Sequence, residues 1–370
     1  MKITFLKEII SLVLFLLIGI SFILYQTTSI SEACTRVVYH GTENMTITGR
    51  SMDWKEDMHS DLWLFPRGIK RDGLAGEKSA QWTSKYGSVV VSGYNAGSAD
   101  GINESGLSAS LLYLAESDYG DPNKNDDKFR ISISLWLQYV LDNHGTVTEA
   151  VADLRKEPFH IIAPVMPDGS PAQLHLAITD TSGDIAVFEY VEGKLVIHHG
   201  KEYQVMTNSP IYDKQLALNE YWENIGGLVF LPGTNRAADR YARASFLVKA
   251  IPQKEMKEYI SAVPGKKYEN QAVASVTSVM RSVSVPLGIT TPTQPNISST
   301  IWRTIVDHKN KVYYFDSATS PNTFWISLSK LDFSENAPVQ KIQLSNGAIF
   351  AGDISNQFIP TKPFDFLPAN

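Results

Sequence analysis

The chain has 370 residues, 43% apolar and 19% charged, with 33 basic and 39 acidic side chains. This composition excludes extensive disorder and allows one large or two medium domains with a sizeable core. The net charge of −6 argues against nucleic acid as the main partner, because phosphate binding needs basic stripes. The single cysteine, Cys34, excludes an intrachain disulfide framework and a multi-cysteine metal cluster.

The first 33 residues have the pattern of a secretory signal. Two lysines precede an apolar run over 9–25, and Ser31 and Ala33 are small residues at positions −3 and −1 relative to Cys34. We therefore predict that 1–33 are removed and that the protein is exported, to the periplasm or outside the cell. Two alternatives stay open. The apolar run is nearly long enough for an uncleaved membrane anchor, and a cysteine after a signal can be lipidated, although Glu32 at position −2 argues against lipidation.

Cleavage before Cys34 has a chemical consequence. The only thiol of the protein becomes the N-terminal residue and lies next to its own α-amine. An α-amine has a pKa of about 7.7–8.0 and a thiol of about 8.5. The amine can therefore accept the thiol proton near neutral pH, so one residue supplies both nucleophile and base. The alternative is a buried, inert thiol, which is the commoner fate of a free cysteine.

Beyond Cys34, the patterns predict strands, helices, strands, helices and strands, in that order. The first strands are expected at 36–39, 45–50, 88–94 and 107–114. A helix is expected at 131–141, and a second one begins at Thr146, where Glu149 completes a capping box and Pro158 bars continuation. Later strands are expected at 173–179, 185–190, 194–198 and 204–207, helices at 237–250, 255–262 and 270–281, and final strands at 300–306, 311–315, 325–329 and 341–344.

This order lacks regular βαβ alternation. It is typical of an α+β fold with mostly antiparallel sheets. No internal repeat, low-complexity tract or linker interrupts the chain. We therefore expect one domain over 34–370.

Most other catalytic patterns are absent. The chain has no G-x-S-x-G nucleophile elbow and no phosphate-cradling glycine loop, and its eight histidines lack metal-ligand spacing. Ser327 and Lys330 match S-x-x-K, but the accompanying S-D-N and K-T-G motifs are missing. Cys34 survives this elimination. If 36–39 and 45–50 form a hairpin, Arg50 and Asp53 return to the level of Cys34, either as its companions or as a surface salt bridge.

Several motifs, in order along 34–370, resemble the choloylglycine hydrolase family, which includes penicillin V acylases and conjugated bile acid hydrolases. They are Cys34-Thr35-Arg36, Gly49-Arg50-Ser51-Met52-Asp53, Asp100-Gly101-Ile102-Asn103-Glu104-Ser105-Gly106-Leu107, Leu174-His175 with Thr179-Asp180, Thr207-Asn208-Ser209-Pro210, Leu231-Pro232-Gly233 and Arg240-Tyr241-Ala242-Arg243. The resemblance implies an N-terminal nucleophile hydrolase with a four-layer αββα fold that contains two stacked antiparallel sheets.

The resemblance also implies roles for individual residues. Cys34 is the nucleophile, Arg50 favours its thiolate, and Asp53 binds the α-amine. Asn208 and the backbone N–H of Tyr113 are the oxyanion donors. Arg240 is the second arginine of the site; Arg243 lies on the same helix face, but the spacing from the Leu-Pro-Gly motif favours Arg240. No metal or organic cofactor is implied.

The implied reaction is hydrolysis of a linear, non-peptide amide through a thioester. We expect an apolar or aromatic acyl group, held near Met52, Trp54 and Tyr113. Tyr113 and the secretory signal favour penicillin V or N-acyl homoserine lactone type amides over conjugated bile acids, which remain the alternative. Family members are often tetramers, so a homo-oligomer is possible, but the chain between Asn208 and Leu231 is short and lacks the family's tetramer-forming insertion. A noncatalytic, membrane-anchored protein is the alternative of a different class if the signal is not cleaved.

Overall fold

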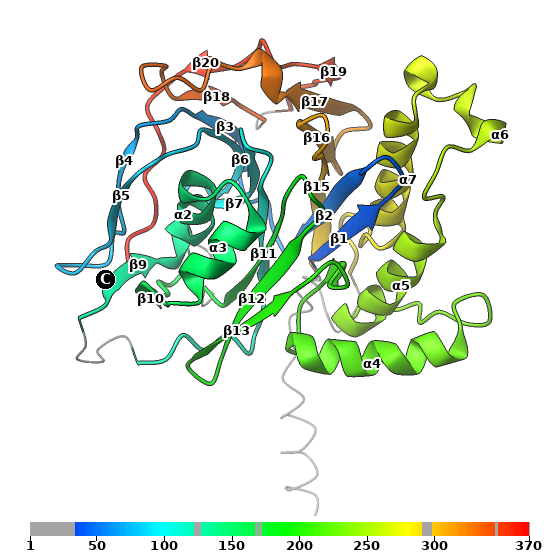
Figure 1. Cartoon of the computed structure of the whole chain (residues 1–370), viewed down its shortest axis with the longest axis horizontal. Coiled ribbons are helices and arrows are strands. Elements are labelled where there is room, and N and C mark those ends of the chain that lie inside the picture. The colour runs from blue at the N-terminus through cyan, green and yellow to red at the C-terminus, as the bar shows by residue number, and fades with distance from the viewer. Residues whose placement is uncertain are drawn as a thin grey trace, which may run out of the picture.

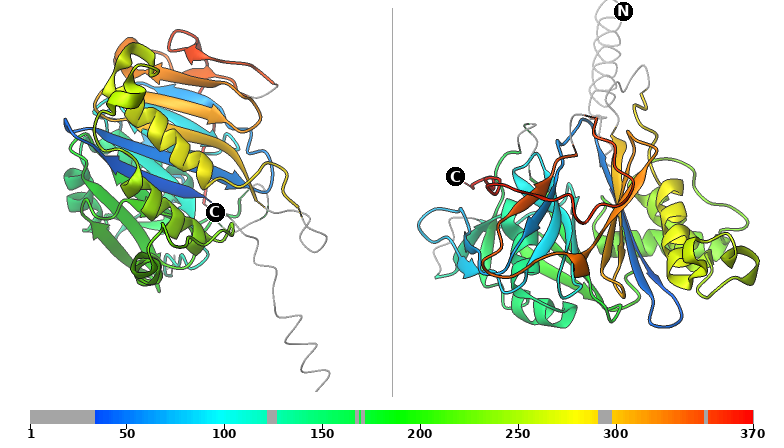
Figure 2. Two further views of the ribbon diagram at one scale, coloured as in Figure 1. Left: turned by 90° about the vertical axis from the view of Figure 1, so that its right-hand side faces the viewer. Right: turned by 90° about the horizontal axis from the view of Figure 1, so that it is seen from above.

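A computed structural model describes residues 34–121, 127–166, 169, 172–290, 298–344 and 347–369. The predicted signal segment, 1–33, and its cleavage lie outside the described residues. Two large sheets dominate the structure and face one another, and helices cover their outer faces (Figures 1 and 2). This arrangement confirms the predicted αββα fold.

The first large sheet has seven strands and carries the start of the described chain. All neighbours pair antiparallel except the last two, which are parallel. In sheet order the strands are β14 (Val205–Met206), β1 (Thr35–His40), β2 (Thr46–Trp54), β15 (Ser299–Asp307), β16 (Val312–Ser317), β17 (Thr323–Ser327) and β19 (Gly352–Asp353).

The second large sheet has nine strands, and all of its pairings are antiparallel. In sheet order they are β13 (Lys194–His199), β12 (Ile185–Val191), β11 (Leu174–Thr179), β8 (Ser108–Tyr113), β7 (Gly97–Asn103), β6 (Ser88–Gly93), β3 (Leu62–Phe65), β18 (Gln340–Ile342) and β20 (Ile359–Pro360). Two small ribbons join β9 (Phe129–Ser132) to β10 (Phe159–Ile162) and β4 (Lys70–Asp72) to β5 (Gln81–Thr83).

Helices cover the outer face of each large sheet (Figure 2). The nine-stranded sheet is covered by α2 (Trp136–Asn143) and α3 (Val147–Leu154), and the seven-stranded sheet by α5 (Ala237–Ala250) and α7 (Tyr268–Ser282). Against α5 packs α4 (Tyr212–Ile225). The remaining turns are α6 (Lys257–Ile260), η1 (Ile133–Leu135), η2 (Pro264–Lys266) and η3 (Leu328–Lys330).

The hairpin of β1 and β2 forms as predicted. Glu43 and Asn44 adopt positive φ in its turn, and the register sets Thr35 opposite Ser51. Helix α7 can lie close over this hairpin because β2 contains Gly49: a Cβ at this position would lie 2.6 Å from Met280 Cγ. The chain therefore brings Cys34 to the residues that follow Arg50 on β2.

The predicted helix over 131–141 is wrong in its first part. Residues Phe129–Ser132 form β9, which pairs in parallel with β10, and the α-helix begins only at Trp136. Phe129 is exposed and Ile131 is buried in this strand. So short an apolar segment fits a strand or a helix, and periodicity alone does not separate the two. The hydrogen bond from Ser132 Oγ to Leu367 O, at 2.6 Å, depends on the distant C-terminal segment. Tertiary pairing therefore overrides the local helical pattern.

The capping box at Thr146 forms, with one change of partner. Thr146 Oγ1 accepts a hydrogen bond from Glu149 N at 3.2 Å, as predicted. The Glu149 carboxylate, however, accepts from Gly145 N at 2.7 Å rather than from the N–H of the N-cap residue, which a capping box ordinarily uses. The helix ends at Leu154, four residues before Pro158.

Candidate active site

Cys34 lies at the start of β1, between the two sheets. Its side chain is 2% exposed in the whole chain. The Sγ atom is 3.9 Å from Met52 Sδ and 3.8 Å from Asp53 O. Burial raises the pKa of the Cys34 thiol, and the positive charge of Arg50 opposes this rise. The thiol therefore depends on neighbouring cations and on a nearby base to form the thiolate.

Arg50 extends from β2 toward this thiol. Its Nη2 is 4.0 Å from Cys34 Sγ and donates to Leu111 O at 2.9 Å. The guanidinium lies 4.5 Å from the ring centroid of Trp302, a cation–π contact. The side chain is 1% exposed, so its charge acts on the sulfur with little screening by water.

Asp53 lies at the end of β2 and is fully buried. Thr300 Oγ1 donates to Asp53 Oδ1 at 2.6 Å, and Ser51 Oγ lies 3.3 Å from Asp53 Oδ2. Ser51 Oγ also accepts from Thr35 N at 3.2 Å. Burial raises the pKa of Asp53 to about 6, while Arg240 and Thr300 act to lower it. The carboxylate is thus close to the first peptide of β1, and its pKa lies above the ordinary range of an aspartate.

Arg240, on α5, joins the start of β1 to the segment that carries Asn208. Its Nη1 donates to Cys34 O at 2.6 Å, and its Nη2 donates to Asn208 Oδ1 at 2.8 Å. Burial lowers the pKa of Arg240 to about 10, so the group stays cationic at neutral pH. Arg243 points elsewhere: it donates to Pro232 O at 2.7 Å. The structure therefore brings Arg240, and not Arg243, to the cysteine.

The side-chain amide of Asn208 is oriented by both neighbours. Because Arg240 holds Oδ1, the amide nitrogen points the other way and donates to Tyr113 O at 2.7 Å. A primary amide carries two N–H groups, so this bond uses one of them. Tyr113 is the last residue of β8, opposite Leu174 of β11. The side-chain amide of Asn208 therefore contacts the backbone carbonyl of Tyr113, whereas the sequence analysis assigned the N–H of Tyr113 as the second oxyanion donor; that role stays a prediction.

An apolar pocket opens beside Cys34. Its cavity volume is about 100 Å³, and Met52, Trp54 and Tyr113 contribute to its wall together with Cys34. Trp54 Nε1 donates to Tyr94 OH at 2.8 Å, and the rings of Trp54 and Tyr113 contact edge to face at 6.3 Å. The three residues expected around the acyl group thus line one cavity with the sulfur.

Two contributors to the site escaped the sequence analysis. Thr300 stabilises the Asp53 carboxylate from β15, 247 positions away along the chain, and the carbonyl oxygen of Leu111 on β8 accepts a hydrogen bond from Arg50. Thr300 opens a predicted strand, but nothing local marks it as a partner of Asp53. Alternation along β15 places Thr300 on a buried face, and this burial is the only feature of the sequence that could have pointed to a role for it.

This arrangement suits nucleophilic attack on a carbonyl. A thiol lies directly before β1, a cation is near its sulfur, and a carboxylate and an amide donor are held nearby. Within the described ranges, no group of three or more His, Cys, Asp and Glu side chains is placed to hold a metal ion.

A family model places the chain among known proteins. The model described as linear amide C–N hydrolases, choloylglycine hydrolase family, matches residues 34–341. The match begins at Cys34, where the described chain also begins.

Curated relatives point the same way. Penicillin V acylase from Pectobacterium atrosepticum is 47% identical over 352 residues, which span 92% of this chain and 93% of that protein. Bile salt hydrolase/transferase from Clostridium perfringens is 28% identical over 245 residues, 59% of this chain and 72% of that protein.

Solved structures agree in fold. Penicillin V acylase from Agrobacterium tumefaciens superposes with a TM-score of 0.81 at 53% identity and covers 90% of this chain and 99% of that chain. A variant of conjugated bile acid hydrolase from Clostridium perfringens gives a TM-score of 0.68 at 22% identity, covering 84% and 97% of the two chains.

Proposed function

Because the chain belongs to the choloylglycine hydrolase family of linear amide C–N hydrolases, we propose that residues 34–370 form the mature domain of an N-terminal cysteine amidohydrolase. Release of 1–33 gives Cys34 a free α-amine. The amine takes the thiol proton, and the sulfur attacks the amide carbonyl. Collapse of the tetrahedral intermediate breaks the C–N bond as the ammonium returns the proton to the leaving amine. Water, deprotonated by the same amine, then cleaves the thioester and releases the acid.

Each buried group has a role in this scheme. Arg50 stabilises the thiolate through its charge, and Asp53 orients the α-ammonium. Asn208 Nδ2 and the backbone N–H of Tyr113 stabilise the oxyanion. Arg240 holds the carbonyl of Cys34 and the amide oxygen of Asn208, so it fixes nucleophile and oxyanion donor relative to one another. This double contact is the observation that carries the proposal, because attack requires both groups in one geometry.

For the substrate, we propose a linear amide with an apolar or aromatic acyl group, of the penicillin V or N-acyl homoserine lactone type. The wall of Met52, Trp54 and Tyr113 beside the sulfur suits such a group. The relatives named penicillin V acylase are more similar to this chain than the bile acid hydrolases are. Conjugated bile acids remain the second candidate, on the strength of the Clostridium relatives.

The substrate experiment uses protein that begins at Cys34, assayed on penicillin V, a long-chain N-acyl homoserine lactone and a glycine-conjugated bile acid. We expect the highest kcat/KM on one of the first two. Preference for the bile acid would overturn the proposed substrate class and leave the amidohydrolase assignment intact. No hydrolysis of any of the three, by folded protein with Cys34 at its N-terminus, would refute the substrate proposal as a whole.

Thr300→Val should move the acid limb of the pH profile of kcat/KM to higher pH. The Thr300 hydroxyl stabilises the Asp53 carboxylate and lowers its pKa, so its loss raises that pKa. A hydrogen bond to a charged group contributes about 1.5–3 kcal/mol, and one pKa unit equals about 1.4 kcal/mol. We therefore expect a shift of about one to two pH units. The wild-type limb should lie at or below pH 6, because the pKa of about 6 is that of Asp53 in the unprocessed chain.

Thr304→Val is the matched control for this shift. Thr304 is a buried threonine of the same strand, and its hydroxyl donates at 2.9 Å to Asp100 Oδ1 instead. It should leave the acid limb in place. An equal shift in both variants, or none in Thr300→Val, would contradict the role assigned to Asp53.

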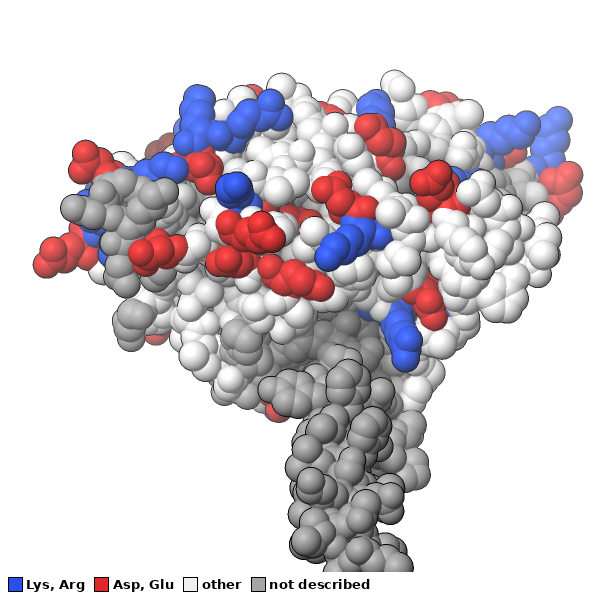
Figure 3. Space-filling model, turned by 90° about the horizontal axis from the view of Figure 1, so that it is seen from below, with Lys and Arg blue, Asp and Glu red and all other residues white. Residues whose placement is uncertain are grey.

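We also propose export to the periplasm or outside the cell, which rests on the signal pattern of 1–33. No helix within the described part of the chain combines the length and hydropathy needed to cross a bilayer. On the face drawn in Figure 3, basic and acidic side chains are interspersed, so this face offers no basic stripe for nucleic acid. Fractionation of the native host tests the export: activity confined to the cytoplasm would refute it.

We also propose that the protein forms a homo-oligomer, because the residues that follow α4 form an exposed apolar surface. Leu228, Val229 and Phe230 are 94%, 81% and 55% exposed, and three consecutive exposed apolar residues suit contact with a second copy of the chain. Light scattering on the protein in solution gives its mass; a monomer at assay concentrations would refute the proposal.

A further inference from the structure

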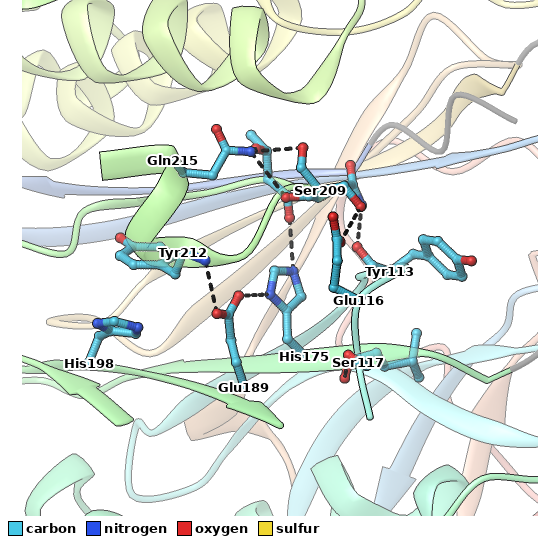
Figure 4. Close-up of polar contacts among 12 residues, drawn as sticks. Tyr113, Glu116, Ser117, His175, Glu189, His198, Ser209, Tyr212 and Gln215 are labelled. Atoms are coloured by element: carbon cyan, nitrogen blue, oxygen red, sulfur yellow. Dashed lines mark hydrogen bonds and ion pairs between the residues drawn. The ribbon is translucent and has the colours of Figure 1, made fainter. Parts of the chain in front are cut away.

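A buried histidine–glutamate pair lies beneath the segment that carries Asn208. His175 on β11 and Glu189 on β12 have side chains that are each 2% exposed, and His175 Nδ1 is 2.8 Å from Glu189 Oε1. His175 Nε2 lies 2.9 Å from Thr207 O. Figure 4 shows the pair pointing away from its sheet toward this segment. No step of the proposed mechanism uses either side chain.

The partners of the pair fix the proton on the imidazole. A carbonyl oxygen can only accept, so His175 Nε2 must carry a proton and donate it to Thr207 O. Nδ1 faces a carboxylate, and one proton lies between them. The other oxygen, Glu189 Oε2, accepts from Tyr212 N at 2.9 Å, at the first residue of α4. A negative charge is favoured at a helix N-terminus, which supports a carboxylate at this position.

The pair therefore holds both ends of one short segment. His175 fixes the carbonyl of Thr207, directly before Asn208, and Glu189 fixes the N–H of Tyr212, four residues after it. Gln215 of α4 fixes the same segment at a third place, because its Nε2 donates hydrogen bonds to Asn208 O at 3.1 Å and to Ser209 O at 3.0 Å. Since the strands of the pair belong to the nine-stranded sheet, the segment is anchored to the same sheet that carries Tyr113.

This connection has a consequence for catalysis. The two oxyanion donors come from different parts of the chain: Tyr113 ends β8, and Asn208 follows β14 of the other sheet. Strand β11 pairs directly with β8, so His175 links the Asn208 segment to the strand next to Tyr113. An error of about 1 Å in such a constellation costs about 10²-fold in rate. A fold held only by packing would leave the relative position of the two donors less defined.

We propose that His175 and Glu189 are positioning residues, which set the place of the Asn208 amide relative to the backbone of Tyr113 through Thr207 and Tyr212. They touch neither substrate nor sulfur. The inference rests on the proposed role of Asn208 as oxyanion donor. This positioning role differs from a purely structural role in one respect: substitution of His175 or Glu189 changes the rate only through the Asn208 side chain.

The test is a double-mutant cycle with His175→Phe and Asn208→Ala, assayed on the best of the three substrates. His175→Phe should lower kcat by about 10- to 100-fold with KM changed by less than about twofold, because an interaction made only in the transition state is weakened. In the Asn208→Ala background it should have little further effect. Equal losses in both backgrounds would overturn the inference, as would an unchanged kcat in His175→Phe alone.

Rescue by a conservative variant gives a second reading. Glu189→Leu should show the same loss of kcat. Glu189→Gln should recover most of it, because the glutamine oxygen can accept from Tyr212 N while its amide donates to Nδ1 of a neutral imidazole that still donates to Thr207 O. If Glu189→Gln is as impaired as Glu189→Leu, hydrogen-bond geometry is not what the pair supplies, and the inference fails.

Two further variants guard against a trivial result. His144→Phe removes another buried histidine, which lies directly after α2 and whose Nε2 is 3.1 Å from Asp153 Oδ2 on α3. This variant should lower thermal stability without changing kcat. If His175→Phe does not fold, Gln215→Leu replaces it in the cycle, since Gln215 holds the same segment from α4. Additive losses for Gln215→Leu and Asn208→Ala would then overturn the inference. Wild-type turnover in the same assay separates this failure from failure of the proposed function.

Discussion

Cys34→Ser should lower kcat/KM for amide hydrolysis by about 10³-fold or more, the scale expected when the nucleophile of an acyl-transfer enzyme is lost. The substitution preserves the size and hydrogen bonding of the side chain, so the pocket and the contacts of Arg240 with the Cys34 carbonyl should persist. A hydroxyl, however, is far less acidic than a thiol, and an α-amine with a pKa of about 7.7–8.0 cannot deprotonate it effectively. The measurement is turnover of the substrate that the wild type prefers.

The control for this variant is its N-terminal sequence and its fold. Both proteins should begin at position 34 and unfold at similar temperatures. Since Cys34 is the only thiol, alkylation of the wild type also counts active sites directly. Full activity of Cys34→Ser, or of wild-type protein that retains 1–33, would contradict the N-terminal nucleophile mechanism.

Asn208→Ala should lower kcat by about 10²–10³-fold, the loss typical of one oxyanion-hole donor. The amide is held on one side by Arg240 and on the other by Tyr113 O, so its second N–H has a defined direction before substrate binds. Donors that need no reorganisation contribute most to stabilising the oxyanion. Because the bond to the oxyanion forms only in the transition state, KM should change little.

Asn103→Ala is the matched control for this loss. Asn103 is fully buried, and its side-chain amide donates to Leu141 O at 2.9 Å and His144 O at 2.7 Å. It lies at the end of β7, away from the sulfur. The variant should unfold at a lower temperature yet retain the wild-type kcat of its folded fraction. If both asparagine variants lose rate equally, the effect of Asn208→Ala reflects general destabilisation, and Asn208 leaves the mechanism.

The sequence predicts Cys34 as the nucleophile because several independent signals coincide at this residue. Cys34 is the only cysteine, it follows a segment with the sequence pattern of a secretory signal and small residues at −3 and −1, and it begins the first family motif. The hairpin of β1 and β2 was predictable for a similar reason. Its register depends on residues that are close together in the chain, so the sequence alone predicts Arg50 and Asp53 beside Cys34.

Contacts between distant segments could not be predicted in this way. Thr300 reaches Asp53 across 247 positions, and Phe129–Ser132 becomes a strand because β10 is available beside it. The helix α4, directly after the Asn208 segment, was not predicted. Most of its side chains are polar or exposed, and its buried residues are Tyr212 and Gln215. It therefore lacks the apolar face from which a helix is predicted.

By itself, then, the sequence predicted Cys34 as the nucleophile and the chemistry of an N-terminal thiol. It also determined the α+β class and, through the family motifs, the residues that surround the sulfur. Only the tertiary structure decided what holds the carboxylate of Asp53 and how Asn208 is fixed against Tyr113. The physical reason is the range of the interactions. Periodicity, capping and hairpin register act over a few residues. The orientation of the Asn208 amide depends instead on groups from both sheets and from α5, which meet only when the whole chain has folded.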